Sequence, residues 1–156
     1  MGYAIEALIG PTEVLEPFVR VQRTARLAPL VGPLALLPMV EILRNAIQRQ
    51  NHDPEREPRW PFWYLSPEGA MNVAETCEKG PLVYVEARFY AGVGTQASVG
   101  WCDGALRHGP VVAPDAINRA LRFLGVQPQD GKDEFDTVGL GRRRSTDDWT
   151  REAKRP

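Results

Sequence analysis

The stretch "LVYVEARFYAGVGTQASVGWCDG", residues 82 to 104, decides the fold that the sequence predicts. Apolar and polar side chains alternate from Leu82 to Tyr90, which is the pattern of a half-buried β-strand. The alternation resumes after two glycines and runs to Trp101, and Asp103-Gly104 then supplies the residue types of a tight type I′ turn. Residues 106 to 113 are expected to follow as a third strand. The stretch therefore predicts a three-stranded antiparallel meander in the C-terminal half.

The glycines of this stretch also raise a question of chemistry. Gly92, Gly94 and Ala97 match the G-x-G-x-x-A spacing of a dinucleotide-binding loop. Such a loop must open a helix whose N-terminus faces the pyrophosphate. Because strand alternation follows the glycines instead, we favour a hairpin bend. The alternative is a bend that keeps its backbone open to a ligand or partner.

The rest of the chain alternates between strand-like and helix-like segments. Two apolar runs that end in turn residues predict buried strands, at residues 3 to 9, with Glu6 as the single charge, and 34 to 39. Helical spacing or capping residues mark four further segments, at residues 12 to 26, 40 to 50, 66 to 79 and 115 to 124. The fold class that we expect is α+β, with a mixed or antiparallel sheet, a C-terminal three-stranded meander, and helices packed on one face.

Length and composition indicate one intracellular domain. The 156 residues are 43% hydrophobic and 25% charged, so we expect a single domain over residues 1 to 149 and a frayed tail over 150 to 156. The charged segment after Gln127 predicts irregular structure. A net charge of -1 gives no basic field, so no nucleic acid is expected as a partner. The sequence shows no export signal and no apolar segment that could span a membrane. We therefore expect a cytoplasmic protein without a membrane partner.

No set of residues in the sequence specifies a reaction. Cys77 and Cys102 lack zinc-site spacing, and the acidic run from Asp130 to Asp136 lacks the ligand spacing of an EF-hand, so no metal or cofactor is expected. Ser98 lacks the glycine and the helix of a nucleophile elbow. Cys102 and His108 are more simply read as neighbouring strand residues. We therefore predict no catalytic residues.

The sequence offers two groups of partner-binding candidates. The first lies on the polar face of the strand over residues 82 to 90 and just beyond the bend, and the second is the acidic loop. Their members are Tyr84, Glu86, Arg88, Tyr90, Gln96, Asp133, Glu134 and Asp136. The aromatic run "WPFWY", residues 60 to 64, either fills the core or forms a patch for a partner.

Three motifs carry a resemblance to a known group of proteins. They are "YVEARFYAGVGTQASVGW" from residue 84, "INRALRFLGV" from residue 117 and "DEFDTVGLGRRRSTDDW" from residue 133. Over about residues 82 to 149 the chain resembles small bacterial immunity-type proteins of polymorphic toxin systems. The resemblance implies a protein that neutralises a cognate toxin domain by direct stoichiometric binding, and it implies no catalytic residues.

A second hypothesis comes from the residues alone. Glu86, Arg88 and Gln96 lie around the glycine bend and combine a carboxylate, a guanidinium and an amide. They would suit a small enzyme or a ligand-binding domain if a concave pocket collected them. A flat surface would favour the immunity-type hypothesis.

Overall fold

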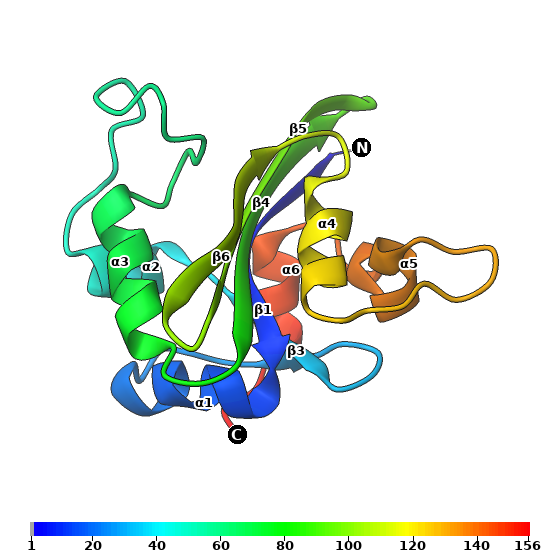
Figure 1. The fold of residues 1–156 in the computed structure, drawn as a ribbon, viewed down its shortest axis with the longest axis horizontal. Helices are drawn as coiled ribbons and strands as arrows, with labels where there is room; N and C mark the ends of the chain where they lie inside the picture. Colours follow the sequence, from blue (N-terminus) through cyan, green and yellow to red (C-terminus); the bar gives the residue numbers. More distant parts are fainter. Residues whose placement is uncertain (1) are drawn as a thin grey trace.

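The chain folds around a six-stranded antiparallel sheet, in a computed structural model that describes residues 2–156 (Figure 1). The strand order is β2-β3-β1-β4-β5-β6, so that β1 and β4 form the centre of the sheet. The α+β class, the antiparallel sheet and the β4-β5-β6 meander are confirmed. The strands are β1 (Tyr3–Pro11), β2 (Ala28–Pro29), β3 (Leu34–Pro38), β4 (Pro81–Tyr90), β5 (Val93–Cys102) and β6 (Ala105–Val112).

Helices cover both faces of this sheet, whereas the sequence predicted them on one (Figure 1). One face carries α1 (Thr12–Val21), α2 (Glu41–Gln48) and α3 (Pro67–Thr76). The other carries α4 (Ala116–Phe123), α5 (Glu134–Val138), the 3-10 helix η1 (Leu140–Arg142) and α6 (Thr146–Glu152). Two separate hydrophobic cores result, one on each side of the central strands.

Alternation along the strands divides the side chains between these cores. In β4, Tyr84 enters the core beneath α1 and α3, while Val83 and Val85 enter the core beneath α4 and α6. All three are completely buried. The expectation of a solvent-exposed polar face on β4 is therefore wrong around Tyr84 and Glu86. A tyrosine and a glutamate look like surface residues in a pattern, but both are buried here because they are hydrogen-bonded.

The glycine bend is the turn of the β4–β5 hairpin. Tyr90 pairs with Val93, and the two residues between them, Ala91 and Gly92, both have positive φ, 52° and 79°. A type I′ turn requires positive φ at both positions. Gly94 is required for another reason, because a Cβ there would lie 1.8 Å from the carbonyl oxygen of Arg88. The bend is thus explained by backbone geometry and close strand packing.

The segment after Gln127 contains more regular structure than its composition predicts. Asp133 caps α5 and Ser145 caps α6, each through a side-chain oxygen that accepts a backbone N–H three residues later. Residues 150 to 156, assigned to a frayed tail from the sequence, include the end of α6. Beyond it, Lys154 and Leu27 exchange two backbone hydrogen bonds of 2.9 Å. Trp149 of α6 is completely buried and anchors this region.

The burial of Trp149 gives a direct test of this C-terminal packing. Trp149→Ala is expected to lower the free energy of unfolding by about 3 to 5 kcal/mol, because it leaves a cavity in the core. Urea unfolding measures the change. Tyr90→Ala is the matched control, since Tyr90 is 76% exposed and its loss should change little. Equal effects of the two substitutions would show that the C-terminal region is not part of the packed domain.

Candidate functional site

Two glutamates lie opposite each other at the centre of the sheet. Glu6 of β1 and Glu86 of β4 are paired in the strand register, and both are buried. Two carboxylates this close in a low-dielectric interior repel each other and favour a shared proton. Their hydrogen bonds show how the protein accommodates them.

Glu86 binds the loop around residues 63 to 65, which covers this face of the sheet. Its Oε2 accepts from the backbone N–H of Trp63 at 2.7 Å. Its Oε1 accepts from the N–H groups of Tyr64 and Leu65 at 2.9 and 3.2 Å. Three consecutive amides therefore converge on one side chain, and such donors are the usual means of stabilising a buried carboxylate.

The hydroxyl of Tyr84 connects the two glutamates. It lies 2.7 Å from Oε1 of Glu86 and 2.9 Å from Oε2 of Glu6. A phenol has one proton, so only one of these contacts can be donated by Tyr84. Because Glu86 already faces three donors, Tyr84 donates to Glu86, and the second proton belongs to Glu6. A protonated Glu6 then donates from Oε2 to the Tyr84 oxygen.

The pKa values agree with this assignment. Burial is the largest effect on Glu6, and with the nearby charge of Glu86 it raises the pKa from 4.5 to about 8, against the lowering effect of Arg44. Burial also raises the pKa of the Tyr84 hydroxyl well above its usual value. The charges of Glu86 and Glu6 raise this pKa by smaller amounts. Glu6 is thus mainly protonated at neutral pH, and Tyr84 remains a neutral phenol.

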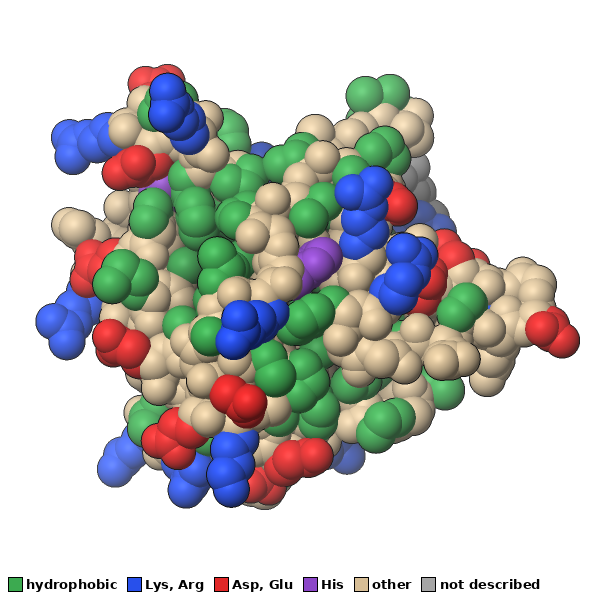
Figure 2. Space-filling model, viewed as in Figure 1, with side chains coloured by type: hydrophobic (Ala, Val, Ile, Leu, Met, Phe, Trp, Pro, Cys, Tyr) green, Lys and Arg blue, Asp and Glu red, His purple; other side chains and the backbone are tan. Residues whose placement is uncertain are grey.

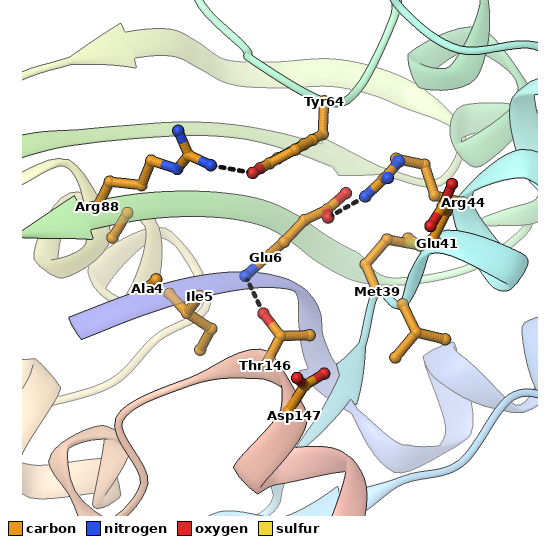
Figure 3. Close-up of a pocket in the computed structure, with 12 residues that line it drawn as sticks. Ala4, Ile5, Glu6, Met39, Glu41, Arg44, Tyr64, Arg88, Thr146 and Asp147 are labelled. Atoms are coloured by element: carbon orange, nitrogen blue, oxygen red, sulfur yellow. Dashed lines mark hydrogen bonds and ion pairs between the residues drawn. The ribbon is translucent and has the colours of Figure 1, made fainter. Parts of the chain in front are cut away.

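Two arginines and Tyr64 lie beside this network (Figure 3). Arg44 of α2 donates from Nη1 to Oε1 of Glu6 at 2.5 Å, and its guanidinium lies 4.7 Å from the centroid of the Tyr64 ring. Arg88 of β4 donates to the Tyr64 hydroxyl, with its guanidinium 5.2 Å from the same centroid. Arg88 also lies 5.7 Å from the ring of Trp63. Both distances to Tyr64 are those of cation–π contacts.

The "WPFWY" run serves the core and the surface at once. Phe62 is buried and packs edge-on against Tyr84, with ring centroids 5.3 Å apart. Trp60 donates from its indole to the carbonyl of Leu65 at 2.6 Å. Trp63, in contrast, is 57% exposed. The core alternative is therefore confirmed for Phe62, whereas Trp63 lies at the surface, where a patch for a partner stays a prediction.

Two small cavities lie next to this network. The first has a volume of about 260 Å³ and is lined by Glu6, Arg44, Tyr64, Arg88 and Thr146, among others. The second has a volume of about 180 Å³, and its lining includes Trp63, Glu86, Arg88, Gln96 and Val112. Glu86, Arg88 and Gln96 all line this cavity, but the side chain of Gln96 is directed to the α4 face of the sheet, opposite to Glu86. However, the oxygens of Glu86 are occupied by the covering loop, and Oε1 of Gln96 accepts from the N–H of Ile117 at 2.9 Å.

The predicted acidic group lies elsewhere. Asp133 caps α5 and also accepts from Asn118, while Glu134 is buried against Arg122, with 2.9 Å between the charged atoms. Asp136 is exposed. Because α5 belongs to the face opposite to Tyr84 and Glu86, the acidic residues and the polar residues of β4 do not form one surface.

Sequence reasoning missed Glu6, Arg44 and Tyr64 as members of the site. The signal for Glu6 was its position as the single charge in an apolar run, since a charge in a buried strand requires partners. Arg44 and Tyr64 reach Glu6 only through the tertiary fold, and nothing in their local sequence indicates it.

A serine–histidine contact in the meander has no nucleophilic character. Ser98 Oγ lies 3.0 Å from Nε2 of His108, but the buried Ser98 hydroxyl donates its proton to the carbonyl of Ala116 at 2.8 Å. Nε2 of His108 must therefore be the donor to Ser98, so it is not free to act as a base. Burial, with a smaller effect of Arg119, lowers the pKa of His108 and favours this neutral ring. Cys102 pairs with Ala105 in the strand register, and His108 with Gly100.

The charge and composition of the rest of the surface say little about function. Acidic and basic side chains are interspersed on the face seen in Figure 2. Within residues 2–156, no three His, Cys, Asp or Glu side chains are grouped to hold a metal ion, and no helix is long and apolar enough to cross a membrane. No protein-family model, curated protein or solved structure matches the chain. The functional argument therefore depends on the geometry described above.

The different roles of the two glutamates predict different responses to amide substitution. Glu86→Gln places an NH₂ group where only acceptors fit, so it should lower the free energy of unfolding at pH 6 by about 2 kcal/mol or more. Glu6→Gln resembles the protonated acid, because its NH₂ can donate to Tyr84 and its oxygen can accept from Arg44. It should not lower the free energy of unfolding at pH 6, and should raise it by up to about 2 kcal/mol, because the variant takes up no proton on folding. Urea unfolding compares them, and a more damaging Glu6→Gln would contradict the proton assignment.

The raised pKa of Glu6 also predicts a pH dependence. Between pH 4.5 and about 8 the folded state keeps a proton that the unfolded state has released, so the contribution of Glu6 to stability falls as pH rises. The slope is at most about 1.4 kcal/mol per pH unit, and it vanishes above the folded pKa. The difference in unfolding free energy between wild type and Glu6→Gln isolates this contribution. A difference that stays constant from about pH 5 to 9 would rule it out.

Proposed function

We propose that the protein is a cytoplasmic immunity-type protein that neutralises a cognate bacterial toxin domain by forming an equimolar complex. The observation that carries the proposal is a surface at one end of the sheet. It consists of Trp63, Arg88, Tyr90, Val93 and Val112, and is called the recognition surface below. Its four apolar members are 57%, 76%, 78% and 61% exposed. The resemblance of residues 82 to 149 to immunity-type proteins, which is a prediction from the sequence, points to the same function.

The recognition surface is continuous because its members share neighbouring hollows. Trp63, Arg88 and Val112 line the cavity of about 180 Å³, and Arg88, Tyr90 and Val93 line a shallower one. Tyr90 and Val93 flank the turn of the β4–β5 hairpin, which extends beyond the neighbouring helices (Figure 1). Exposed aromatic side chains around an arginine are the composition of energetically dominant contacts in protein interfaces.

The buried network supports this proposal by holding the surface in one conformation. The amides of Trp63 and Tyr64 are bound to Glu86, and the hydroxyl of Tyr64 accepts from Arg88. A binding surface that is already ordered loses less conformational entropy when a partner docks. In this proposal Tyr84 and Glu86 act from beneath the surface, while Arg88 and Tyr90 contact the toxin directly.

A ligand-binding domain is the second candidate, because the cavity of about 180 Å³ collects Glu86, Arg88 and Gln96. An enzymatic version of it is less well supported. Glu86 and Gln96 use their acceptor atoms within the protein, so neither offers a free acid or base.

The immunity hypothesis is tested by co-expression with the product of the adjacent gene. An equimolar complex and rescue of growth are expected. Tyr90→Ala and Arg88→Ala should each weaken the complex at least about 10-fold, which corresponds to about 1.4 kcal/mol. Met71→Ala is the matched control, because Met71 is 65% exposed on α3, outside the recognition surface. Absence of both complex and rescue would overturn the proposal, and equal effects of Tyr90→Ala and Met71→Ala would overturn the location.

A further inference from the structure

Arg44 is a largely buried arginine with a single hydrogen-bond acceptor. Its side chain is 13% exposed, and a guanidinium carries five N–H donors. Within residues 2–156 its one side-chain hydrogen bond is the contact with Oε1 of Glu6. Arg44 also lines the cavity of about 260 Å³, called the arginine cavity below. Its remaining donors are not enclosed by residues 2–156, so they are open to the arginine cavity, where an acceptor can approach them.

The charge of Arg44 is not neutralised by its neighbour. The hydrogen bonds of Tyr84 require a proton on Glu6, so the contact between Arg44 and Glu6 joins a cation to a neutral acid. Arg88, on the same cavity, has no carboxylate within 4.0 Å among residues 2–156. Its one side-chain hydrogen bond there is to the hydroxyl of Tyr64. Two uncompensated guanidinium groups therefore contact the Tyr64 ring.

The remaining walls restrict what the cavity can hold. Thr146 accepts from the N–H of Glu6 through Oγ1, and its own hydroxyl proton is directed to no acceptor within residues 2–156. Ile5 and Met39 supply apolar surface. Glu41 and Asp147 are exposed carboxylates on the same lining, and they disfavour highly charged anions such as nucleotides. A carboxylate fits the planar donor pair of an arginine, and the two arginines of this cavity match the two charges of a small dicarboxylate.

We propose that the arginine cavity binds a small organic carboxylate, whose oxygens accept from Arg44 and Arg88 while Tyr64 and Met39 contact its carbon skeleton. The site lies beside the recognition surface and shares Arg88 with it. The proposal depends on the donors of Arg44 and not on the immunity function, so either can fail while the other stands.

Succinate is the probe for this site. A titration followed by ¹H–¹⁵N NMR at pH 7, with sodium chloride keeping the ionic strength constant, should give saturable shifts at Tyr64, Thr146 and the Nε–H of Arg44. Succinamide, which has the same shape without charge, should not shift these signals. Arg44→Gln and Arg88→Gln should each weaken binding at least about 10-fold. Arg143→Gln is the matched control, because Arg143 is exposed and pairs with Glu152 outside this cavity.

Two variants keep the outcome decisive. Arg88 is exposed, so Arg88→Gln should stay folded even if Arg44→Gln does not. Arg143→Gln lies outside the cavity, so it should retain binding and show that the loss is not a general effect of removing an arginine. Linear shifts that sodium chloride reproduces, equal shifts with succinamide, or unchanged affinity in Arg88→Gln would each overturn the proposal.

Discussion

The binding of three consecutive backbone amides by the Glu86 carboxylate is the interaction on which the rest of the structure depends. A charge in the centre of a sheet is costly unless several donors surround it. The N–H groups of Trp63, Tyr64 and Leu65 supply these donors, and in return the loop is fixed over one face of the sheet. The position of Phe62 in the core and of Trp63 at the surface both follow from this attachment.

The state of Glu6 follows from the charge of Glu86. The strand register places the two glutamates opposite each other, and Tyr84 contacts both. Since Glu86 must accept, Glu6 must hold a proton, and Arg44 then contacts a neutral acid. One buried carboxylate thus determines the protonation of the second and leaves the charge of an arginine available at a cavity. The same network orders the loop beside the recognition surface, and so it connects the core to both proposals.

The sequence predicted the local features of this fold well. Asp103-Gly104 and the strand alternation around the glycine bend indicated the meander, because turns and alternation depend on neighbouring residues. The predicted exposure of Tyr84 and Glu86 was wrong, since a polar residue in an alternating strand looks the same whether it faces water or a buried hydrogen-bond partner. The backbone partners of Glu86 lie more than 20 residues away, and no local pattern indicates that distance. For α6, the capping residue Ser145 and the apolar Trp149 were local signals of a helix. The charged composition of the segment led us to predict irregular structure instead.

Glu6 is a protonated glutamic acid buried beside the ionised Glu86, and infrared spectroscopy of the carboxyl groups distinguishes this state from two carboxylates. Exposed carboxyl groups are ionised at pH 7, so a carboxylic acid C=O band there reports a buried protonated group. The structure predicts such a band in the wild type, its loss as pH rises through about 8, and its absence in Glu6→Gln. A wild-type spectrum without this band at pH 7, or a band that persists in Glu6→Gln, would show that Glu6 is not a buried protonated acid.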